Sequence, residues 1–161
     1  MTELVVVVLI LSVLGGALVP KITGRMAASR DARRLSDMRA IRDAIEQYHL
    51  DEGHYPEPKK NGGFGGWDVS HDGDFIPELL DKGYLREIPS DPKNDSTFHY
   101  RYYVYDKGTY GCQGDGDYYV LGVRTFETDD MANENPGYFR CNSRNWNSEF
   151  AYVTGGGASA E

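Results

Sequence analysis

Acidic and hydroxyl side chains alternate in one short segment of the chain. Asp68, Ser70, Asp72 and Asp74 occupy every second position, with Gly73 sixth and Phe75 eighth. Oxygen ligands at this spacing around a turn glycine are typical of calcium-binding loops. The twelfth position, where such a loop carries a bidentate acid, is Leu79, and Glu78 lies one residue short. A calcium site is therefore a hypothesis beside the alternative of a solvated polar loop, and no other cofactor is indicated.

A single carboxylate, Glu3, stands directly before a nearly unbroken apolar run over residues 4–19. A charge in a membrane-length segment costs about 2.5–3.5 kcal/mol at the helix centre and less near an end, so it usually marks a function. The alternative is an acid in the first turn of a membrane anchor, where the positive end of the helix dipole favours it.

Cys112 and Cys141 are the only cysteines of the chain. In an exported protein an even pair predicts a disulfide. Closing a loop of about 30 residues would stabilise the fold by roughly 3–4 kcal/mol. The alternative is two free thiols in a reducing compartment. A metal site is disfavoured, because neither cysteine has a His or Cys partner at zinc-ligand spacing.

Catalysis finds little support among the remaining polar residues. The four histidines are scattered, and no Ser/His/Asp or Cys/His grouping follows from the spacing. The glycines of residues 62–66 lack the Lys-Ser/Thr of a phosphate-binding loop. An enzyme is therefore the least favoured class.

Charge is distributed unevenly along the chain, whose net charge is -8. The first 49 residues hold seven Lys and Arg against five Asp and Glu, whereas the rest hold 10 against 20. The acidic remainder disfavours nucleic-acid binding. The early basic residues suit a membrane surface or the acids of a partner, although an ordinary solvated helix face would look the same. They are Lys21, Arg25, Arg30, Arg33, Arg34, Arg39 and Arg42.

One long helix is predicted from near Thr2 to about Asp51. Beyond Pro20, apolar residues recur at helical spacing at Leu35, Met38, Ile41, Ile45 and Tyr48. Gly53 then ends the pattern. Fifty residues would make a rod of about 75 Å, far longer than a small head can cover. We expect the apolar stripe to pack on the protein's own sheet and the first half of the helix to be buried elsewhere.

The helix contains a predicted weak stretch at Gly15, Gly16 and Pro20. Glycine costs about 1 kcal/mol in a helix interior and proline about 3 kcal/mol. A simple kink tolerated in a membrane helix is the alternative to local unwinding.

The sequence after the long helix of residues 1–53 predicts a small α+β head over residues 54–161. Residues 54–97 read as a loop-rich connector with a short helix at residues 76–81. Residues 98–105, 117–125 and 149–154 have strand patterns rich in Tyr, Val and Phe, which suggests an antiparallel sheet packed on the helix. Residues 155–161 look like a frayed tail.

The order of these features resembles the N-terminus of type IV pilins, with type IVa-like major pilins as the nearest group, and of the related pseudopilins of type II secretion. Glu3 and Pro20 are seventeen positions apart, which is the spacing of that family. The family usually has four residues before the Glu, whereas only Met1 and Thr2 precede it here. The resemblance implies a pilin fold whose residues 1–20 form a membrane or filament-core segment and residues 21–53 an amphipathic half, with a stapled region at residues 112–141.

The resemblance also implies a function. The chain would be a single-pass inner-membrane protein that polymerises with copies of itself into an extracellular filament on the bacterial surface, for adhesion, twitching motility or DNA uptake. Met1 would be a methylated N-terminus whose ammonium pairs with Glu3 of an adjacent subunit, and residues 15–20 would unwind in the filament. The implied partners are the pilus assembly machinery and a prepilin peptidase.

Four alternatives stay open from the sequence. A minor pilin or a type II secretion pseudopilin, which would form a short piston, shares the same N-terminal pattern. A singly anchored receptor or adhesin would explain the apolar run but not Glu3. A calcium-binding module would require the loop that begins at Asp68.

Overall fold

The computed structural model of the chain describes the backbone of residues 2–158 and the side chains of residues 4–12 and 23–158. Its first element is helix α1, Thr2–Glu52, which is continuous through Gly15, Gly16 and Pro20. The helix ends where Gly53 takes a φ of 79° and donates its N–H to the His49 carbonyl at 2.9 Å. The predicted helix and its glycine terminator are confirmed.

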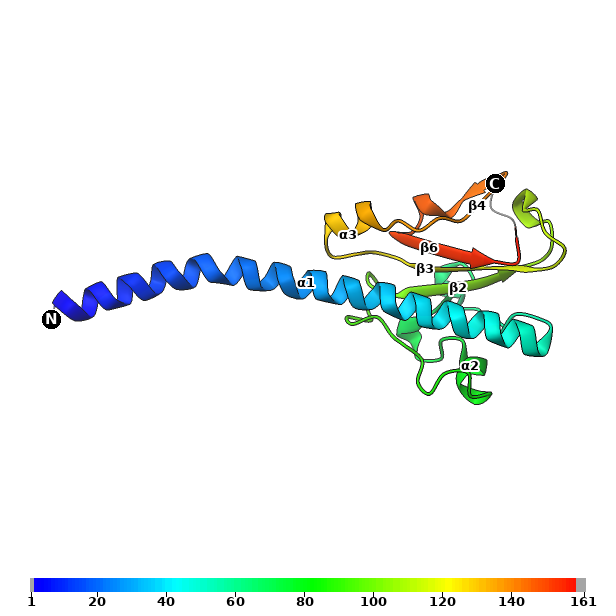
Figure 1. Cartoon of the computed structure of the whole chain (residues 1–161), viewed down its shortest axis with the longest axis horizontal. Helices are drawn as coiled ribbons and strands as arrows, with labels where there is room; N and C mark the ends of the chain where they lie inside the picture. The colour runs from blue at the N-terminus through cyan, green and yellow to red at the C-terminus, as the bar shows by residue number, and fades with distance from the viewer. Residues whose placement is uncertain (1, 159–161) are drawn as a thin grey trace.

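The second half of α1 lies along the head, and the first half projects away from it (Figure 1). The head contains a four-stranded antiparallel sheet in the order β1-β2-β3-β6, formed by Asp68–Val69, Tyr100–Tyr105, Tyr118–Val123 and Tyr152–Gly156. A small hairpin pairs β4, Arg140–Cys141, with β5, Arg144–Asn145. Two short helices complete the head, α2 at Pro77–Asp81 and α3 at Asp129–Glu134.

The predicted apolar stripe of α1 packs on one face of this sheet. Met38, Ile41, Ile45 and Tyr48 are fully or almost fully buried, and Leu35 packs at the edge of the same cluster. Their sheet partners include Tyr100, Tyr102, Tyr119 and Leu121. Each large apolar side chain removed from water contributes roughly 1.5–3 kcal/mol, so this contact is a main source of head stability.

A second core covers the opposite face of the sheet. Strand residues alternate between the two faces, so Tyr118 and Val120 join this core while Tyr119 and Leu121 join the first. Trp146, Phe139 and Phe150 of the C-terminal region close over it. The structure joins Cys112 to Cys141 within this layer, with Cα atoms 4.7 Å apart, as predicted.

The strand predictions hold for β2 and β3, but the boundary at the C-terminal strand was wrong. Gly155 and Gly156, expected in a frayed tail, form the end of β6 and pair with Val120 and Tyr119. Added Cβ atoms would lie 2.5 Å from the Tyr119 carbonyl oxygen at Gly155 and 2.3 Å from Glu46 Oε1 at Gly156. The glycines are therefore needed for close packing within the sheet and against α1. Residues 159–161 lie outside the described part of the chain.

Candidate functional site

Residues 4–11 of the projecting half of α1 present apolar side chains on all sides. Residues 4–11 are Leu, Val or Ile, and each is between 51% and 72% exposed. A helix that is apolar all round is normally buried by other protein or by lipid, because exposing apolar surface to water on every side is energetically unfavourable. Within the part of the chain that the structure describes, no helix is both long and apolar enough to qualify as a membrane span.

Where α1 meets the head, buried ion pairs fix the helix in place. We call this cluster the joint; its members are Arg30, Asp31, Arg34, Asp91 and Glu127. Arg34 is completely buried and donates Nε and Nη2 to the two carboxylate oxygens of Asp91, at 2.6 and 2.9 Å. Its Nη1 donates to Asp31 at 2.5 Å and to Glu127 at 3.0 Å. Burial opposes the charge on Arg34, but these bonds to Asp91, Asp31 and Glu127 hold its pKa above the ordinary value.

The acids of the joint attach the segment before α3 to the helix. The buried Asp31 carboxylate accepts hydrogen bonds from the backbone N–H groups of Glu127 and Thr128 and from the Thr128 hydroxyl, at 2.8–3.1 Å. Glu127 also pairs with Arg30 at 2.6 Å and Lys93 at 3.0 Å. The hydrogen bond from Arg30 is the largest cause of the lowered pKa of Glu127, so the carboxylate stays ionised. The joint is thereby a fully paired network rather than a set of isolated charges.

Three tyrosine–carboxylate hydrogen bonds continue this attachment along the helix. Tyr100 donates to Asp37 at 2.8 Å, and Tyr119 donates to Glu46 at 2.8 Å. Tyr48 of α1 donates to Glu78 of α2 at 2.6 Å. Burial raises the pKa of Asp37, and the Tyr100 hydroxyl partly offsets this rise. The head therefore holds the second half of α1 through apolar and polar contacts, and none of these contacts involves the described side chains of residues 4–12.

The joint was not predicted from the sequence. Arg30 and Arg34 were interpreted as facing a membrane, a partner or solvent, and both instead pair with acids of their own head. The one local signal was the i, i+3 pair of Asp31 and Arg34, immediately before the apolar stripe.

The structure does not gather the four residues of the calcium hypothesis. The buried Asp68 carboxylate accepts from the backbone N–H groups of Lys59 and Ile76 at 2.9 and 3.1 Å. Ser70 donates to Asn94 at 2.9 Å, Asp72 accepts from Asn61, and Asp74 pairs with Lys59. Among the described residues, no three His, Cys, Asp or Glu side chains are grouped so as to hold a metal ion.

The predicted assembly residues lie at the edge of what the structure describes. Met1 falls outside the described residues, and the side chain of Glu3 falls outside the described side chains. Gly15, Gly16 and Pro20 belong to α1, where residues 13–22 are described as backbone alone. Their expected roles therefore remain predictions.

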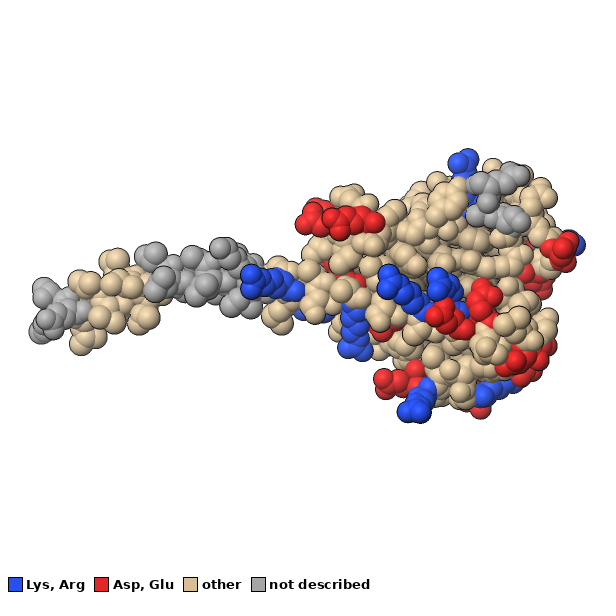
Figure 2. Space-filling model, viewed as in Figure 1, with Lys and Arg blue, Asp and Glu red and all other residues tan. Residues whose placement is uncertain are grey.

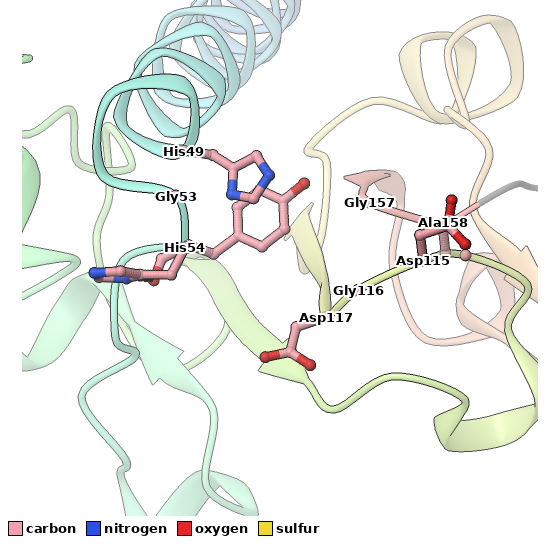
Figure 3. A pocket seen from close by; sticks show the side chains of 10 residues that line it. His49, Gly53, His54, Asp115, Gly116, Asp117, Gly157 and Ala158 are labelled. Carbon is pink, nitrogen blue, oxygen red and sulfur yellow. Dashed lines mark hydrogen bonds between the residues drawn. The ribbon is translucent and has the colours of Figure 1, made fainter.

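A cleft of about 680 Å³ lies between the end of α1 and two loops of the head (Figure 3). His49, His54, Asp115 and Asp117 line it together with several glycines. His49 stacks on Tyr55 with ring centroids 4.0 Å apart, and Asp117 accepts from the backbone N–H of Lys107 at 3.0 Å. No serine, threonine, cysteine or lysine lines this cleft, so its described lining supplies none of these nucleophiles.

Comparison with known proteins finds similarity to core proteins of type II secretion systems. The family model described as "Type II secretion system (T2SS), protein G" matches residues 21–122. The type II secretion system core protein G of Pseudomonas aeruginosa is 30% identical over 122 residues, which cover 75% of this chain and 79% of that protein.

Two further relatives carry the same description. The core protein G of Escherichia coli is 29% identical over 94 residues, and that of Aeromonas hydrophila is 30% identical over 94 residues. These alignments cover 56% of this chain, and they span 61% and 62% of the two relatives, less than two thirds of their length. No solved structure matches the chain significantly.

Proposed function

This chain belongs to the type II secretion system (T2SS) protein G family, and on that premise we propose that it is a pseudopilin. In this role it is a structural subunit, not an enzyme, and it polymerises into a helical filament by packing its N-terminal helix against those of neighbouring copies. The broader resemblance to pilin-like proteins is supported by the family match. The narrower identification as a type IVa-like major pilin is not supported, and neither are twitching motility, adhesion or DNA uptake.

The exposed apolar stretch of α1 over residues 4–11 carries this proposal. Residues 4–11 are more than half exposed around the whole helix, while the joint and the sheet hold the other half rigidly in the head. Burying each of these side chains against a neighbouring helix would contribute roughly 1.5–3 kcal/mol. A bundle of like helices removes all of this surface from water, and no contact within a single copy does so.

We also propose the location and the partners of the subunit. Residues 4–19 would lie in the inner membrane before assembly, and a prepilin peptidase and the inner-membrane assembly machinery would handle the chain there. Glu3 would then pair with the N-terminal ammonium of an adjacent subunit, because an unpaired acid in a low-dielectric bundle is costly. Glu3→Ala should leave the head folded but impair assembly, and normal filaments from this variant would exclude the role.

Lysine substitution at matched exposed positions tests the polymerisation proposal. Val7 and Leu50 are apolar residues of α1 that are 53% and 77% exposed, but Val7 lies in the projecting half and Leu50 beside the head. We expect Val7→Lys to abolish sedimentable filaments and Leu50→Lys to retain them, with the same thermal unfolding of the head in both. Membrane fractionation of both variants separates a failure of insertion from a failure of assembly. Filaments of normal yield from Val7→Lys would contradict the proposal.

A pilus subunit is a second candidate because of the disulfide. Cys112 and Cys141 staple the C-terminal layer, as in the pilins that the sequence resembles. The two candidates differ in their product, since a pilus is a long surface fibre and a pseudopilus a short periplasmic one. Electron microscopy of native cells, with labelled antibody to the head, distinguishes them by filament length and position.

A further inference from the structure

The outward face of α1 beside the joint carries arginines around a strip of small side chains. Arg25, Arg33 and Arg39 are exposed on this face. At about 3.6 residues per turn, Arg33 and Arg39 flank a strip of exposed small residues, and Arg25 lies in line with it one turn before its first residue; the strip is Ser29, Ala32, Ser36 and Ala40. Small residues allow another element to approach the helix closely, and the arginines offer it positive charge.

Two of these three cations have no ion-pair partner among the described residues of their own subunit, and the third is only loosely paired. In the part of the chain that the structure describes, Arg25 and Arg39 have no ion-pair partner. Arg33 lies 3.7 Å from Asp37, and its side chain is 63% exposed. By contrast, Arg30 and Arg34 are held in the joint. The face is therefore a helix surface whose positive charge is left available.

Helix α3 displays the complementary charge. Asp129, Asp130 and Glu134 are exposed, and none of them has an ion-pair partner among the described residues. The opposite side of α3, with Met131 and Ala132, packs on the first core, and the Thr128 backbone N–H donates a hydrogen bond to Asp31 of α1. The three acidic side chains are therefore exposed to solvent on a helix that is itself held in place by its packing and by the Thr128–Asp31 hydrogen bonds. Figure 2 shows a group of acidic side chains over α3 and basic side chains on the adjoining part of the long helix.

Two features keep these charges apart within one copy: Arg33 projects about 200° around the helix from Asp31, which binds Thr128, and Arg25 and Arg39 lie at other levels along the axis. Thr128 directly precedes α3, and its hydrogen bond to Asp31 places the start of α3 level with Asp31 along the axis of α1. Arg25 lies six residues before this level and Arg39 eight after it, which is about 9 Å and 12 Å along the helix axis. A parallel second copy shifted by roughly 9–12 Å in either direction would bring its α3 level with one of these arginines.

From this charge complementarity we propose that the α1 face of Arg25, Arg33 and Arg39 receives the acidic α3 of a second copy of this chain. The inference rests on the proposed function, because it places the contact between neighbouring subunits of the filament. A single exposed ion pair contributes little, so the contact depends on several pairs acting together. It sets the register between heads and weakens with salt, whose screening length is about 8 Å at physiological ionic strength.

Charge reversal on each side, followed by recombination, tests this contact. We compare the triple variants D129K/D130K/E134K and R25E/R33E/R39E with the sixfold variant that combines them, all in the full chain. Each triple variant should lose sedimentable filaments, and the sixfold variant should recover them. The matched control D81K/D106K/D115K changes three other exposed acids by the same charge and should assemble normally.

Cysteine cross-linking measures the same contact directly. Asp130→Cys should form an intersubunit disulfide with Arg25→Cys or Arg39→Cys in assembled protein, whereas Asp81→Cys should not. If the wild-type chain forms no filaments, the proposed function itself fails. If it forms filaments but the triple variants also do, the sixfold variant is not restored, the charge control fails to assemble, or neither cysteine pair cross-links, then this inference alone is overturned.

Discussion

Arg34 of α1 and Asp91 of the connector form two parallel hydrogen bonds, Nε to Oδ2 at 2.6 Å and Nη2 to Oδ1 at 2.9 Å, with neither side chain exposed. This bidentate geometry is the strong form of a charged hydrogen bond. Asp31 and Glu127 occupy the remaining Nη1 donor, so the guanidinium is paired on all three nitrogens. This ion pair connects the loop at Asp91, 57 residues beyond Arg34 in the sequence, to the point where the helix leaves the head.

Removal of this guanidinium should be strongly destabilising. Arg34→Met keeps the length of the side chain but leaves Asp91 and Asp31 buried with fewer partners, and breaking such a pair typically costs about 3–5 kcal/mol. Arg33→Met is the matched control, since the adjacent Arg33 is exposed and only loosely paired, and should change stability by less than about 0.5 kcal/mol. Urea unfolding of the detergent-solubilised chain measures both. Equal stability of the two variants would show that the joint is not a stabilising element.

The repeating parts of this fold could be predicted from the sequence, and the joint could not. The stripe from Leu35 to Tyr48 repeats at helical spacing, and β2 and β3 are dense in β-forming residues, so both patterns are visible locally. Two of the three acidic partners of Arg34 lie 57 and 93 residues away, and a charged residue on a helix usually indicates solvent. Pairing at that distance is decided by the packing of the whole head.

Short elements were missed for a related reason. Strand β1 has two residues and α3 has six, too few for a period to emerge. The second core depends on Trp146, Phe139 and Phe150, which lie in irregular segments and come together through tertiary packing. The acidic α3 therefore has no local sequence signal that identifies it as a positioned surface.

A side chain at Gly155 should disturb the end of the sheet. An added Cβ would lie 2.5 Å from Phe139 Cε2 and from the Tyr119 carbonyl oxygen, so both neighbours would have to shift. We expect Gly155→Ala to destabilise the chain by about 1–3 kcal/mol, as overpacking does. Gly62→Ala is the control because no atom lies within 4 Å of its added Cβ. Thermal unfolding with equal midpoints for both variants would argue against this packing.

Loss of the disulfide should destabilise the C-terminal layer without detaching α1. The cysteines are 29 residues apart, and chain entropy gives a stabilisation of roughly 3–4 kcal/mol for a loop of this size. Cys112→Ser should therefore lower the unfolding midpoint in non-reducing buffer while membrane insertion is retained. Dithiothreitol should lower the wild-type midpoint by a similar amount and leave the variant unchanged. An unchanged midpoint for Cys112→Ser would contradict a stabilising role of the bond.

The buried carboxyl of Asp68 should make stability depend on pH. Burial raises its pKa from 3.8 to about 6, an effect only partly offset by hydrogen bonds from the Lys59 and Ile76 backbone, and Oδ1 has no hydrogen-bond partner among the described residues. A raised folded-state pKa means that the protonated form is favoured on folding, so its contribution is complete below pH 3.8 and is lost as the pH rises through about 6.

Because folding raises this pKa from 3.8 to about 6, the free energy of unfolding should fall by roughly 1–3 kcal/mol between about pH 4 and pH 7. Asp68→Asn cannot ionise and should show a smaller decline in unfolding free energy over this range. Asp81→Asn, at an exposed position, should follow the wild type. Chemical denaturation at pH 4, 5, 6 and 7 gives the comparison, and parallel curves for the wild type and Asp68→Asn would place the pH dependence elsewhere.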